Sequence, residues 1–410
     1  MKRKLLQSIL GFEAKKIIGK YQPKVITITG SVGKTSTKKA ISLLLEKYFT
    51  VWGGSGNLNT EFGVPLTFMG EKKGGGASFW EWFKIIISGF GLILIRRKDY
   101  PKVIVAEIGA DKPGDISYLT GLVRPDISVV TMIGETPAHI GNYESLEQFI
   151  AEETKIVEIL EEDSFAILNF DDPLVRNMKE KTKARVIYFG FGDGADVKIE
   201  GFMTETKKNN DAEVPYGVSF KLSFQGKSQR IHLPYCLGKP SAYSVAASFA
   251  SGMVMGLNLD RAPDIFRDLR PEKGRMNLIE VNGCFILDDT YNASPVATIS
   301  ALETLSSLLG KRRIAVLGDM KELGERSISS HRQIGEMVSQ TCNLLITIGD
   351  LAEEIKEGAI NAGMDIEDTS HYATNKEVVD KLKILLQAGD LVLIKGSRSM
   401  GMEEIVKKIV

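Results

Sequence analysis

The residues with the clearest chemistry lie in the segment Val25–Ala40, VITITGSVGKTSTKKA. Its β-branched start predicts a buried strand, the glycines of GSVGKT predict a tight turn, and the following residues predict a helix. Backbone N–H groups in such a turn and the positive end of the helix dipole bind phosphate. Lys34 can reach the outer phosphates of a nucleotide, and the Thr35 hydroxyl can ligate Mg²⁺. Because Ile28 stands where the usual G-x4-G-K-[ST] pattern has a glycine, we predict a phosphate loop of shortened form.

An acidic residue and a histidine accompany two further predicted strands. Val103–Ile108 carries Glu107 near its end, and Ile127–Ile133 is followed by His139. The carboxyl ends of parallel strands meet at one edge of a sheet, which is also where the phosphate loop lies. Glu107 and His139 are therefore candidate Mg²⁺ ligands. A lone histidine is often only structural, and that alternative stays open for His139.

A loop rich in glycine and asparagine, Gly53–Pro65, follows the helix of the phosphate loop. Its Asn57, Asn59 and Thr60 side chains could orient a nucleotide phosphate, a metal-bound water or a substrate carboxylate. A plain surface loop is the alternative.

The last part of the chain repeats an alternation of strands and helices. The predicted strands are Cys284–Asp288, Arg313–Leu317, Leu344–Ile348 and Leu391–Lys395. Polar clusters lie at the ends of three of them: DDTYN from Asp288, GD ending at Asp319, and KGSR from Lys395. Because ligands bind at the carboxyl ends of strands in such sheets, we expect these clusters to face a nucleotide across a cleft between two domains.

Positioning these residues requires an α/β fold. We predict a P-loop central ATPase domain with a mostly parallel sheet, followed by a C-terminal Rossmann-like α/β domain. Short alternating runs from about 186 to 233 predict an antiparallel extension of the central sheet. The predicted boundaries are a short N-terminal helix over 1–22, the central ATP-binding domain over 23–262 and the C-terminal domain over 263–410.

Composition restricts the class of protein. The 410-residue chain has 52 basic and 52 acidic residues, so its net charge is zero. A general nucleic-acid binder would be strongly basic, so we expect no nucleic-acid partner. The widely spaced Cys236, Cys284 and Cys342 predict buried thiols in a reducing compartment. The start MKRKLLQSILGF lacks the long apolar stretch and the cleavage site of a signal peptide, so we expect a cytoplasmic protein. We also expect the protein to be a monomer.

The most hydrophobic run is Phe79–Ile95, FWEWFKIIISGFGLILI. With 17 residues, interrupted by Glu81, Lys84 and two glycines, it is too short for a helix that spans a membrane. A helix or helical hairpin packed on the protein is one interpretation. Trp80, Trp82 and the following RRK would also suit contact with a membrane interface, and both interpretations stay open.

Together these strings resemble the Mur ligases, ATP-dependent amide ligases of peptidoglycan synthesis. The matching stretches run from about residue 25 to the C-terminus: ITGSVGKTSTK, GNLNTEFGVPLTF, VAEIGADKPGDISYLTGLVRPDISVVT, PAHIGNYESLE, DDTYNASP, VLGDMKELGERS and LVLIKGSRSMGMEEIV. Within the family the chain is most similar to the branch that adds D-Ala-D-Ala to UDP-MurNAc-tripeptide. The resemblance implies these two substrates as partners, ATP and Mg²⁺ as cofactors, and a role in cell-wall biogenesis, cell shape and cell division.

The resemblance also implies roles for residues of this chain. Nucleotide binding would fall to Gly30, Ser31, Val32, Gly33, Lys34, Thr35, Ser36, Asn292 (near adenine) and Asp319 (near the ribose). Magnesium would be ligated by Thr35, Glu107 and His139. Arg275 would enter the cleft from the C-terminal domain and act with Lys34, Glu107 and His139 in catalysis. The amine substrate would lie near Lys395, Ser397 and Arg398.

Three departures from the family pattern matter. The family usually has a UDP-binding domain before the phosphate loop, and because only residues 1–22 precede the first strand, we expect that domain to be absent. Fourteen residues after the histidine the family has a lysine carbamylated by CO₂, where this chain has Glu153. We expect Glu153 to supply that carboxylate directly, as a catalytic and metal-binding residue. Lys155 is the alternative, although it lies about 200° around a helix from Glu153. Pro240 and Ser241 replace a His and an Asn of the family.

The chemistry that the resemblance implies is the ATP-dependent joining of a carboxylate to an amine. A carboxylate is a poor electrophile, so the γ-phosphoryl group of ATP first converts it to an acyl phosphate, which the amine then attacks. Two other interpretations stay open. One is a Mur-like ligase that acts on a different acceptor, such as a lipid-linked one, which the absent domain and Phe79–Ile95 motivate. A nucleotide-binding scaffold subunit with a decayed ligase site is the other, motivated by the loss of lysine at position 153.

Overall fold

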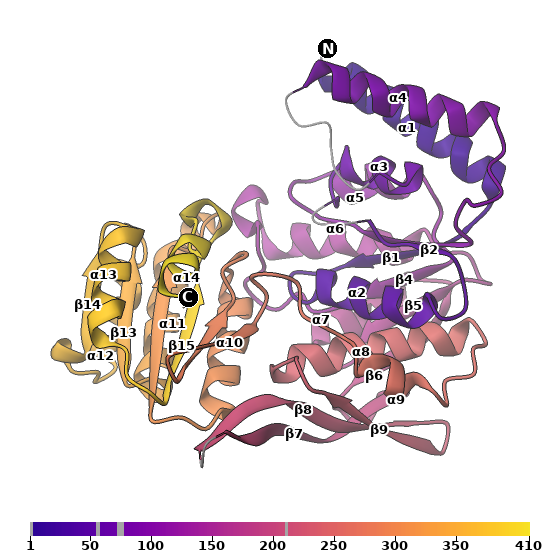
Figure 1. The fold of residues 1–410 in the computed structure, drawn as a ribbon. Helices are drawn as coiled ribbons and strands as arrows, with labels where there is room; N and C mark the ends of the chain where they lie inside the picture. The colour runs from indigo at the N-terminus through magenta and orange to yellow at the C-terminus, as the bar shows by residue number, and fades with distance from the viewer. Residues whose placement is uncertain (1–2, 55–57, 72–77, 210–211) are drawn as a thin grey trace.

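Two α/β domains lie side by side in the computed structural model, which describes residues 3–54, 58–71, 78–209 and 212–410 (Figure 1). A pair of helices, α1 (Arg3–Tyr21) and α4 (Phe79–Leu94), lies above the first domain. The prediction of an α/β protein with two sheet domains is confirmed. Asn57, a predicted substrate residue, lies outside the described residues.

The middle domain is built on a nine-stranded sheet in the order β2-β3-β1-β4-β5-β6-β7-β8-β9. Its strands are β1 (Lys24–Thr29), β2 (Val51–Trp52), β3 (Val103–Glu107), β4 (Ile127–Val130), β5 (Phe165–Asn169), β6 (Arg185–Gly190), β7 (Val197–Asn209), β8 (Ala212–Phe224) and β9 (Lys227–Leu233). Neighbours pair in parallel from β2 to β7 and antiparallel from β7 to β9. Because β1 lies between β3 and β4, the segments that follow these three strands meet at one edge of the sheet.

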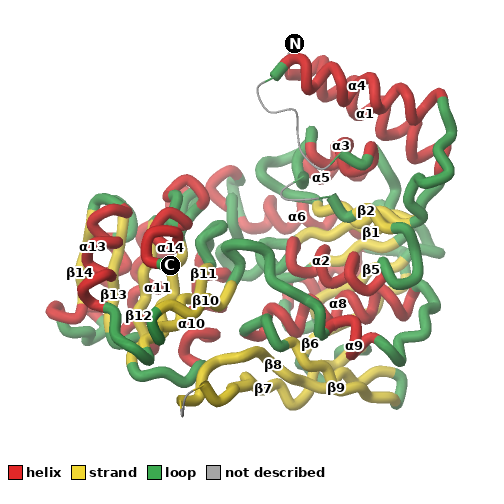
Figure 2. The backbone as a smooth tube through the Cα atoms, in the orientation of Figure 1, coloured by secondary structure: helices red, strands yellow, loops and turns green. Residues whose placement is uncertain are grey.

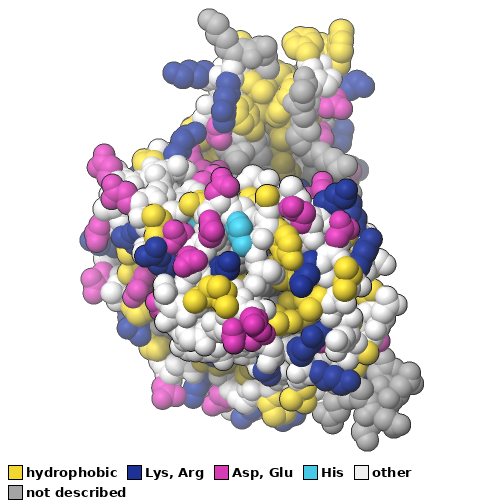
Figure 3. Space-filling view, turned by 90° about the vertical axis from the view of Figure 1, so that its left-hand side faces the viewer, with side chains coloured by type: hydrophobic (Ala, Val, Ile, Leu, Met, Phe, Trp, Pro, Cys, Tyr) yellow, Lys and Arg dark blue, Asp and Glu magenta, His cyan; other side chains and the backbone are white. Residues whose placement is uncertain are grey.

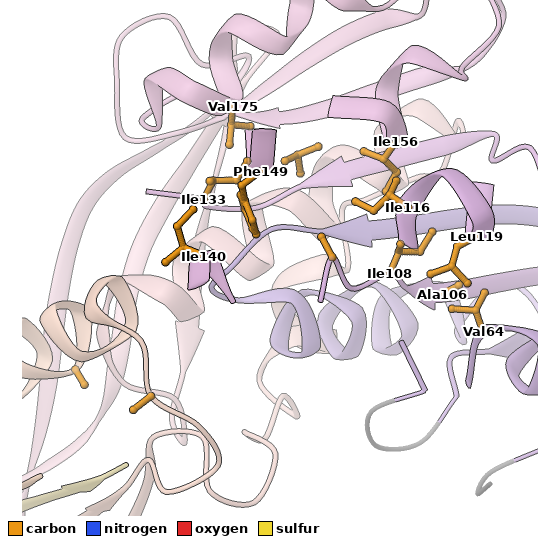
Figure 4. Close-up of a cluster of buried hydrophobic side chains, with 14 of the residues drawn as sticks. Val64, Ala106, Ile108, Ile116, Leu119, Ile133, Ile140, Phe149, Ile156 and Val175 are labelled. Atoms are coloured by element: carbon orange, nitrogen blue, oxygen red, sulfur yellow. The ribbon is translucent and has the colours of Figure 1, made fainter. Parts of the chain in front are cut away.

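Helices cover both faces of this sheet (Figure 2). They are α2 (Lys34–Leu45), α3 (Gly63–Met69), α5 (Asp115–Thr120), α6 (Leu146–Glu158), α7 (Pro173–Arg176), α8 (Gly238–Val254) and α9 (Ala262–Phe266), with the 3-10 turns η1 (Ile140–Asn142) and η2 (Asn177–Lys181). One face packs against α2, α8 and α9, and the other against α3, α5 and α6. Figure 4 shows the core on the face that α3, α5 and α6 cover, where Ile108, which follows β3, lies beside Ile116, and Phe149 of α6 lies beside Ile133. Each fully buried aliphatic or aromatic side chain contributes about 1.5–3 kcal/mol to the stability of this layer.

Two predictions about this sheet were wrong in detail. The strand predicted over Ile127–Ile133 ends at Val130, because the Met132 carbonyl accepts hydrogen bonds from the N–H groups of Ser31 and Val32 instead of continuing the ladder. The antiparallel extension was predicted from about 186, but β6 pairs in parallel with β5, since α7 and η2 form a crossover between them. The antiparallel part begins at β7.

The C-terminal domain has a six-stranded sheet in the order β10-β11-β15-β12-β13-β14. Its strands are β10 (Asn277–Val281), β11 (Cys284–Asp288), β12 (Arg312–Gly318), β13 (Leu344–Ile348), β14 (Thr369–Tyr372) and β15 (Asp390–Lys395). Its helices are α10 (Pro295–Ser307), α11 (Ser327–Thr341), α12 (Glu353–Asn361), α13 (Asn375–Leu385) and α14 (Glu403–Ile409), with the turns η3 (Gly324–Arg326), η4 (Ile366–Asp368) and η5 (Arg398–Met400). Only β10 and β11 are antiparallel. The four predicted strands are confirmed to within a residue at each end.

The passage between the domains follows α9. Ile265, Phe266 and Leu269 are buried in the core that α2 and α8 share with the sheet of the middle domain. The first strand of the C-terminal domain, β10, begins at Asn277. The boundary at 263 stays a prediction, and from these contacts we propose that the middle domain extends to Leu269.

The two N-terminal helices pack on each other and on α3. Leu10 and Ile17 of α1 and Ile85 and Leu92 of α4 are buried in this contact. The interpretation of Phe79–Ile95 as a helix packed on the protein is confirmed. Among the described residues, no helix combines the length and the apolar character needed to cross a membrane.

Candidate active site

A cleft of about 420 Å³ lies between the two domains, within the range of small-molecule sites. Sequence-predicted residues line both of its walls: Ser31, Val32, Gly33, Lys34, Thr35, Ser36, Asn59, Thr60, Glu107 and His139 from the middle domain, and Arg275, Asn292, Lys395 and Arg398 from the C-terminal side. Pro240 and Ser241, at the start of α8, also line it. The cleft therefore brings together most of the residues that were singled out along the whole chain.

The phosphate loop connects the end of β1 to the start of α2. Gly30 has a φ of 121°, and a Cβ atom there would lie 2.3 Å from Thr131 Oγ1, so only glycine fits. Lys34 Nζ donates a hydrogen bond to the Gly30 carbonyl oxygen. The buried Ser31 Oγ has no hydrogen-bond partner among the described residues, which is costly unless a ligand supplies one. With the positive end of α2 facing the cleft, the loop fits nucleotide phosphates.

A buried hydroxyl–carboxylate pair lies next to the phosphate loop. Thr35 Oγ1 donates to Glu107 Oε2 over 3.0 Å, and Lys38 Nζ lies 3.7 Å from the same carboxylate oxygen. The register of β1 and β3 pairs Ile28 with Glu107, which places the carboxylate at the end of β1. Thr35 and Glu107 were predicted on the sequence as two of the magnesium ligands, and they meet here.

The described residues contain no group of three or more His, Cys, Asp or Glu side chains that could hold a metal ion. Nucleotide-bound Mg²⁺ takes only one or two ligands from the protein and the others from phosphates and water. The oxygen atoms of Thr35 and Glu107 therefore fit Mg²⁺ that arrives with a nucleotide.

Glu153 reaches from α6 toward the phosphate loop. Its Oε2 accepts a hydrogen bond of 2.6 Å from Thr29 Oγ1 at the end of β1. Burial raises the pKa of Glu153, and the charge of Lys34 and the Thr29 hydroxyl act in the opposite direction. Lys155 pairs instead with Glu152, with 2.6 Å between Nζ and Oε2, and remains partly exposed. Of the two candidates for the place of the carbamylated lysine, only Glu153 faces the loop.

His139 joins the middle domain to the C-terminal domain. Its Nδ1 pairs with the carboxylate of Glu322, and its Nε2 lies 3.5 Å from Asp111 Oδ1. The N–H of Gly141 donates to the Glu322 carbonyl over 2.8 Å, and Arg326 Nη1 donates to the Glu135 carbonyl over 3.0 Å. In this structure His139 thus contacts carboxylates at the rim of the cleft, and the Glu107 carboxylate has other partners.

The C-terminal wall of the cleft carries a cationic group. Lys395 is buried, pairs with the carboxylate of Asp289 and donates to the Asn292 carbonyl over 2.9 Å. The Asn292 side chain accepts from the backbone N–H of Arg398 over 3.3 Å. The guanidinium carbon of Arg398 lies 5.6 Å from the centre of the Tyr291 ring. These contacts hold the segments 289–292 and 395–398 together at the wall of the cleft.

Two predicted residues of the C-terminal domain do not line the cleft. Asp319 is buried, and its Oδ1 accepts from the N–H groups of Leu351 and Ala352 at 3.0 and 2.7 Å. Its Oδ2 pairs with Lys321 Nζ over 2.6 Å. Ser397 Oγ accepts from the N–H of Lys321 over 2.8 Å. Both side chains brace the ends of β12 and β15 and are absent from the lining of the cleft.

Sequence reasoning assigned no role to Tyr291. The Arg275 guanidinium stacks 4.0 Å from the centre of its ring, and burial raises the pKa of Tyr291. The available signal was an aromatic residue within the polar string DDTYN at the end of a strand. Asp111 was also missed as a partner of His139, because nothing in its local sequence shows that pairing.

Two protein-family models match this chain. Residues 91–252 match the model of the Mur ligase middle domain, and residues 274–398 match that of the Mur ligase glutamate ligase domain. The chain is 29% identical over 401 residues to the UDP-N-acetylmuramoyl-tripeptide–D-alanyl-D-alanine ligase of Bacillus subtilis, an alignment that covers 97% of this chain and 78% of that protein. The corresponding Escherichia coli ligase is 27% identical, with 94% and 76% covered.

Among solved structures, MurF ligase from Thermotoga maritima in complex with ADP is similar with a TM-score of 0.80 and 25% identity, covering 98% of this chain and 83% of that one. A pseudomurein peptide ligase type C from Methanothermus fervidus shares the fold, with a TM-score of 0.66 at 19% identity, covering 96% and 80%.

Proposed function

The chain belongs to the Mur ligase family of ATP-dependent amide ligases, and from that premise we propose that it joins UDP-MurNAc-tripeptide to D-Ala-D-Ala. The observation that carries the proposal is the cleft, in which a phosphate loop with a hydroxyl–carboxylate pair faces a cationic wall of the second domain. The similarity to D-alanyl-D-alanine ligases over nearly the whole chain supports this choice of substrates.

The reaction has two steps. A carboxylate oxygen of the tripeptide attacks the γ-phosphorus of ATP, the bond to the β-phosphate oxygen breaks, and ADP leaves. The amine nitrogen of D-Ala-D-Ala then attacks the acyl carbon, loses a proton, and expels inorganic phosphate with the former carboxylate oxygen. The protein contributes mainly alignment, charge neutralisation and exclusion of water, because water would hydrolyse the acyl phosphate.

On the middle-domain wall, Lys34 would turn from the Gly30 carbonyl to the outer phosphates. Ser31 Oγ and the N–H groups at the start of α2 would bind phosphate oxygens. Thr35 and Glu107 would hold Mg²⁺, which supplies positive charge to the phosphates when bound. For His139 to serve as a further ligand, it would first have to leave Glu322.

We assign Glu153 the place of the carbamylated lysine of the family. Its burial, its hydrogen bond from Thr29 and its electrostatic coupling to Lys34 support a carboxylate that positions the phosphate loop without CO₂. Since its oxygen is held by Thr29 at the end of β1, Glu153 would reach a metal ion only through water.

On the opposite wall, Arg275 and Arg398 lie near the ring of Tyr291, and Lys395 is close by. Guanidinium groups bind carboxylates in a two-point geometry. We propose that Arg398 binds the free carboxylate of D-Ala-D-Ala, and that Arg275 stabilises charge that develops on the phosphoryl group. Asn59 and Thr60, across the cleft, would contact the carboxylate substrate.

The test is phosphate release from ATP by purified protein, with each substrate alone and with both together, and with the product identified by mass. Release that needs both substrates, together with an adduct of the expected mass, supports the proposal. Phosphate release with another carboxylate, and none with UDP-MurNAc-tripeptide, would contradict the proposed substrate but would still support ligase activity. ATP binding without product from any carboxylate–amine pair would instead support a nucleotide-binding scaffold.

A further inference from the structure

We propose that α1 and α4 form a membrane-docking surface that binds anionic lipid. The surface consists of the outward apolar side chains of α4 and the basic side chains around them. None of its residues lines the cleft, and the ligase reaction described above does not use it.

The helix α4 has three distinct faces. Its buried face carries Ile85, Gly89 and Leu92 and packs on the protein. A second, apolar stripe has spacings of three and four residues and is exposed: Trp80 68%, Phe83 45%, Ile87 54%, Phe90 41% and Leu94 80%. On a helix this stripe covers an arc of about 100°. The third face carries Glu81, Lys84 and Ser88.

This apolar stripe is unusual for a surface. Scattered exposed hydrophobic residues are normal, but a contiguous row of large ones marks an interaction site. Phe79 and Ile95, at 60% and 70% exposed, extend the row at both ends, and Leu5 and Phe12 of α1 are also exposed. Figure 3 shows hydrophobic side chains gathered at the upper end of the molecule, with Lys and Arg side chains to either side.

Charge identifies the partner. The basic side chains of the helix pair and its C-terminal extension are Arg3, Lys4, Lys15, Lys16, Lys20, Lys84, Arg96, Arg97 and Lys98. On the same segments the acidic residues are Glu13, which is buried, and Glu81, and the exposed Asp99 follows Lys98 directly. Arg96, Arg97 and Lys98 are exposed and form no ion pair with any described residue. Apolar residues flanked by such cations match an anionic lipid surface, which attracts each Lys or Arg and accepts the apolar side chains at the headgroup boundary.

A second copy of the chain fits this surface less well. Pairing two α4 stripes would bring together the cations of both copies, which outnumber the exposed acidic residues Glu81 and Asp99, and like charges in contact oppose association. A helix lying in the interface has no such conflict. Its 16 residues span about 24 Å, shorter than the hydrocarbon core, which favours lying on the membrane over crossing it.

The helix pair is attached to the rim of the cleft. Arg3 pairs with Glu61 over 2.7 Å and lies 5.3 Å from the ring centre of Phe62. Phe62 in turn contacts Trp82 of α4 edge-on. Asn59 and Thr60, which precede Glu61, line the cleft. Docking of α4 on a membrane would therefore hold this rim close to the lipid surface.

The test uses the full chain and sedimenting vesicles, either of phosphatidylcholine alone or of phosphatidylcholine with a quarter of phosphatidylglycerol. We expect binding to the anionic vesicles that weakens about tenfold or more when salt rises from about 0.1 M to about 1 M. The double variant Phe83→Ser/Ile87→Asn removes apolar area and should bind about tenfold or more weakly. Arg96→Glu/Arg97→Glu should lose binding to a similar extent on anionic vesicles.

Matched controls come from α13 on the other domain. Ile384 is 87% exposed, more than any residue of the stripe, and Ile384→Asn should bind vesicles like the wild type. Lys381→Glu/Lys383→Glu makes the same charge change as the arginine variant and should also leave binding unaltered. All four variants alter only exposed side chains, and equal thermal melting will verify that they fold.

Three outcomes would overturn the proposal. The first is a wild-type protein that does not sediment with anionic vesicles. The second is equal loss of binding in the α4 variants and the α13 controls. The third is a wild-type dimer in sedimentation equilibrium that Phe83→Ser/Ile87→Asn dissociates, because a second copy would then be what covers the stripe.

Discussion

Two buried glutamates in different regions of the molecule have opposite surroundings. Glu153 of α6 accepts a hydrogen bond from Thr29 and is coupled to the charge of Lys34. Glu13 of α1 lies in the contact with α4, where a Cβ atom on Gly89 would come within 2.7 Å of its carboxyl carbon. The backbone N–H of Phe90 offsets part of the shift, but neither carboxylate oxygen of Glu13 has a well-formed hydrogen bond among the described residues.

Burial raises the pKa of both groups, to about 7 for Glu13. A perturbed pKa therefore does not by itself distinguish a reaction site from a packing contact. The difference lies in the partners. Around Glu153 a cation and a hydroxyl favour the charged form. Among the described residues, only the N–H group of Phe90 favours the charged form of Glu13, which can avoid the cost of a buried charge by taking up a proton.

The largest effect should come from removing the cation beside Glu153. Lys34→Ala should lower ATP-dependent product formation about 100-fold or more, because charge stabilisation at the phosphoryl group is lost. Phosphate release under saturating substrates measures it. Lys356→Ala on α12 serves as the lysine control and should retain full turnover. Unaltered activity of Lys34→Ala would remove the phosphate loop from the mechanism.

The next effect should come from Glu153 itself. Glu153→Gln keeps the shape of the side chain and its contact with Thr29 but loses the charge, and turnover should fall about 10–100-fold. Glu13→Gln, the matched change at the other buried glutamate, should leave turnover unaltered. Activity of the wild type should not depend on added bicarbonate. Full activity of Glu153→Gln, or wild-type activity that tracks bicarbonate, would contradict the role given to this carboxylate.

Glu13, whose replacement should not alter turnover, should instead affect the pH dependence of stability. Because the pKa of Glu13 is raised from 4.5 to about 7 in the folded state, the folded protein binds the proton more tightly. The contribution of Glu13 to the free energy of unfolding is therefore present in full below pH 4.5 and is lost as pH rises through 7. At pH 8 Glu13→Gln should be more stable than the wild type by about 1–3 kcal/mol, and at pH 4.5 equally stable. Denaturant unfolding at both pH values measures this, and a pH-independent difference would mean that Glu13 keeps its charge.

The smallest effect should come from a carboxylate that is paired but exposed. Glu322 pairs with His139 across the domains while its side chain is 52% exposed. Exposed pairs contribute about 0–1 kcal/mol, so Glu322→Gln should alter KM for ATP less than about fivefold. A lower KM is the expected direction, because His139 no longer has to leave Glu322. A large rise in KM would show instead that the pair shapes the nucleotide site.

The fold class and the phosphate-loop half of the site were accessible from the sequence. A strand, a glycine turn, a lysine, a hydroxyl and a helix are contiguous in VITITGSVGKTSTKK, and local propensities predict each of them. The strands of the C-terminal domain were equally readable, because buried parallel strands are short apolar runs between turn residues. Local propensity could not show that β4 ends at Val130, since the reason is a contact of Met132 with the phosphate loop.

The C-terminal half of the site was predicted less completely. Asp319 follows β12 as expected, but its carboxylate is saturated by the N–H groups of Leu351 and Ala352 and by Lys321. The stacking of Arg275 on Tyr291 joins residues sixteen positions apart, and no periodicity indicates it. Side-chain pairings of this kind depend on how strands and loops are brought together.

By itself the sequence determined which groups are available: the phosphate loop, Glu107 at the end of a strand, a glutamate at position 153, and an apolar run with basic residues after it. These follow from residue types within one turn or one strand, where local physics decides. Only the tertiary structure decided their surroundings. It directs Glu153 rather than Lys155 at the phosphate loop, leaves Glu13 without a well-formed hydrogen bond from any described residue, and turns one stripe of α4 outward. The physical reason is that burial, pairing and exposure are properties of contacts between segments far apart in the chain.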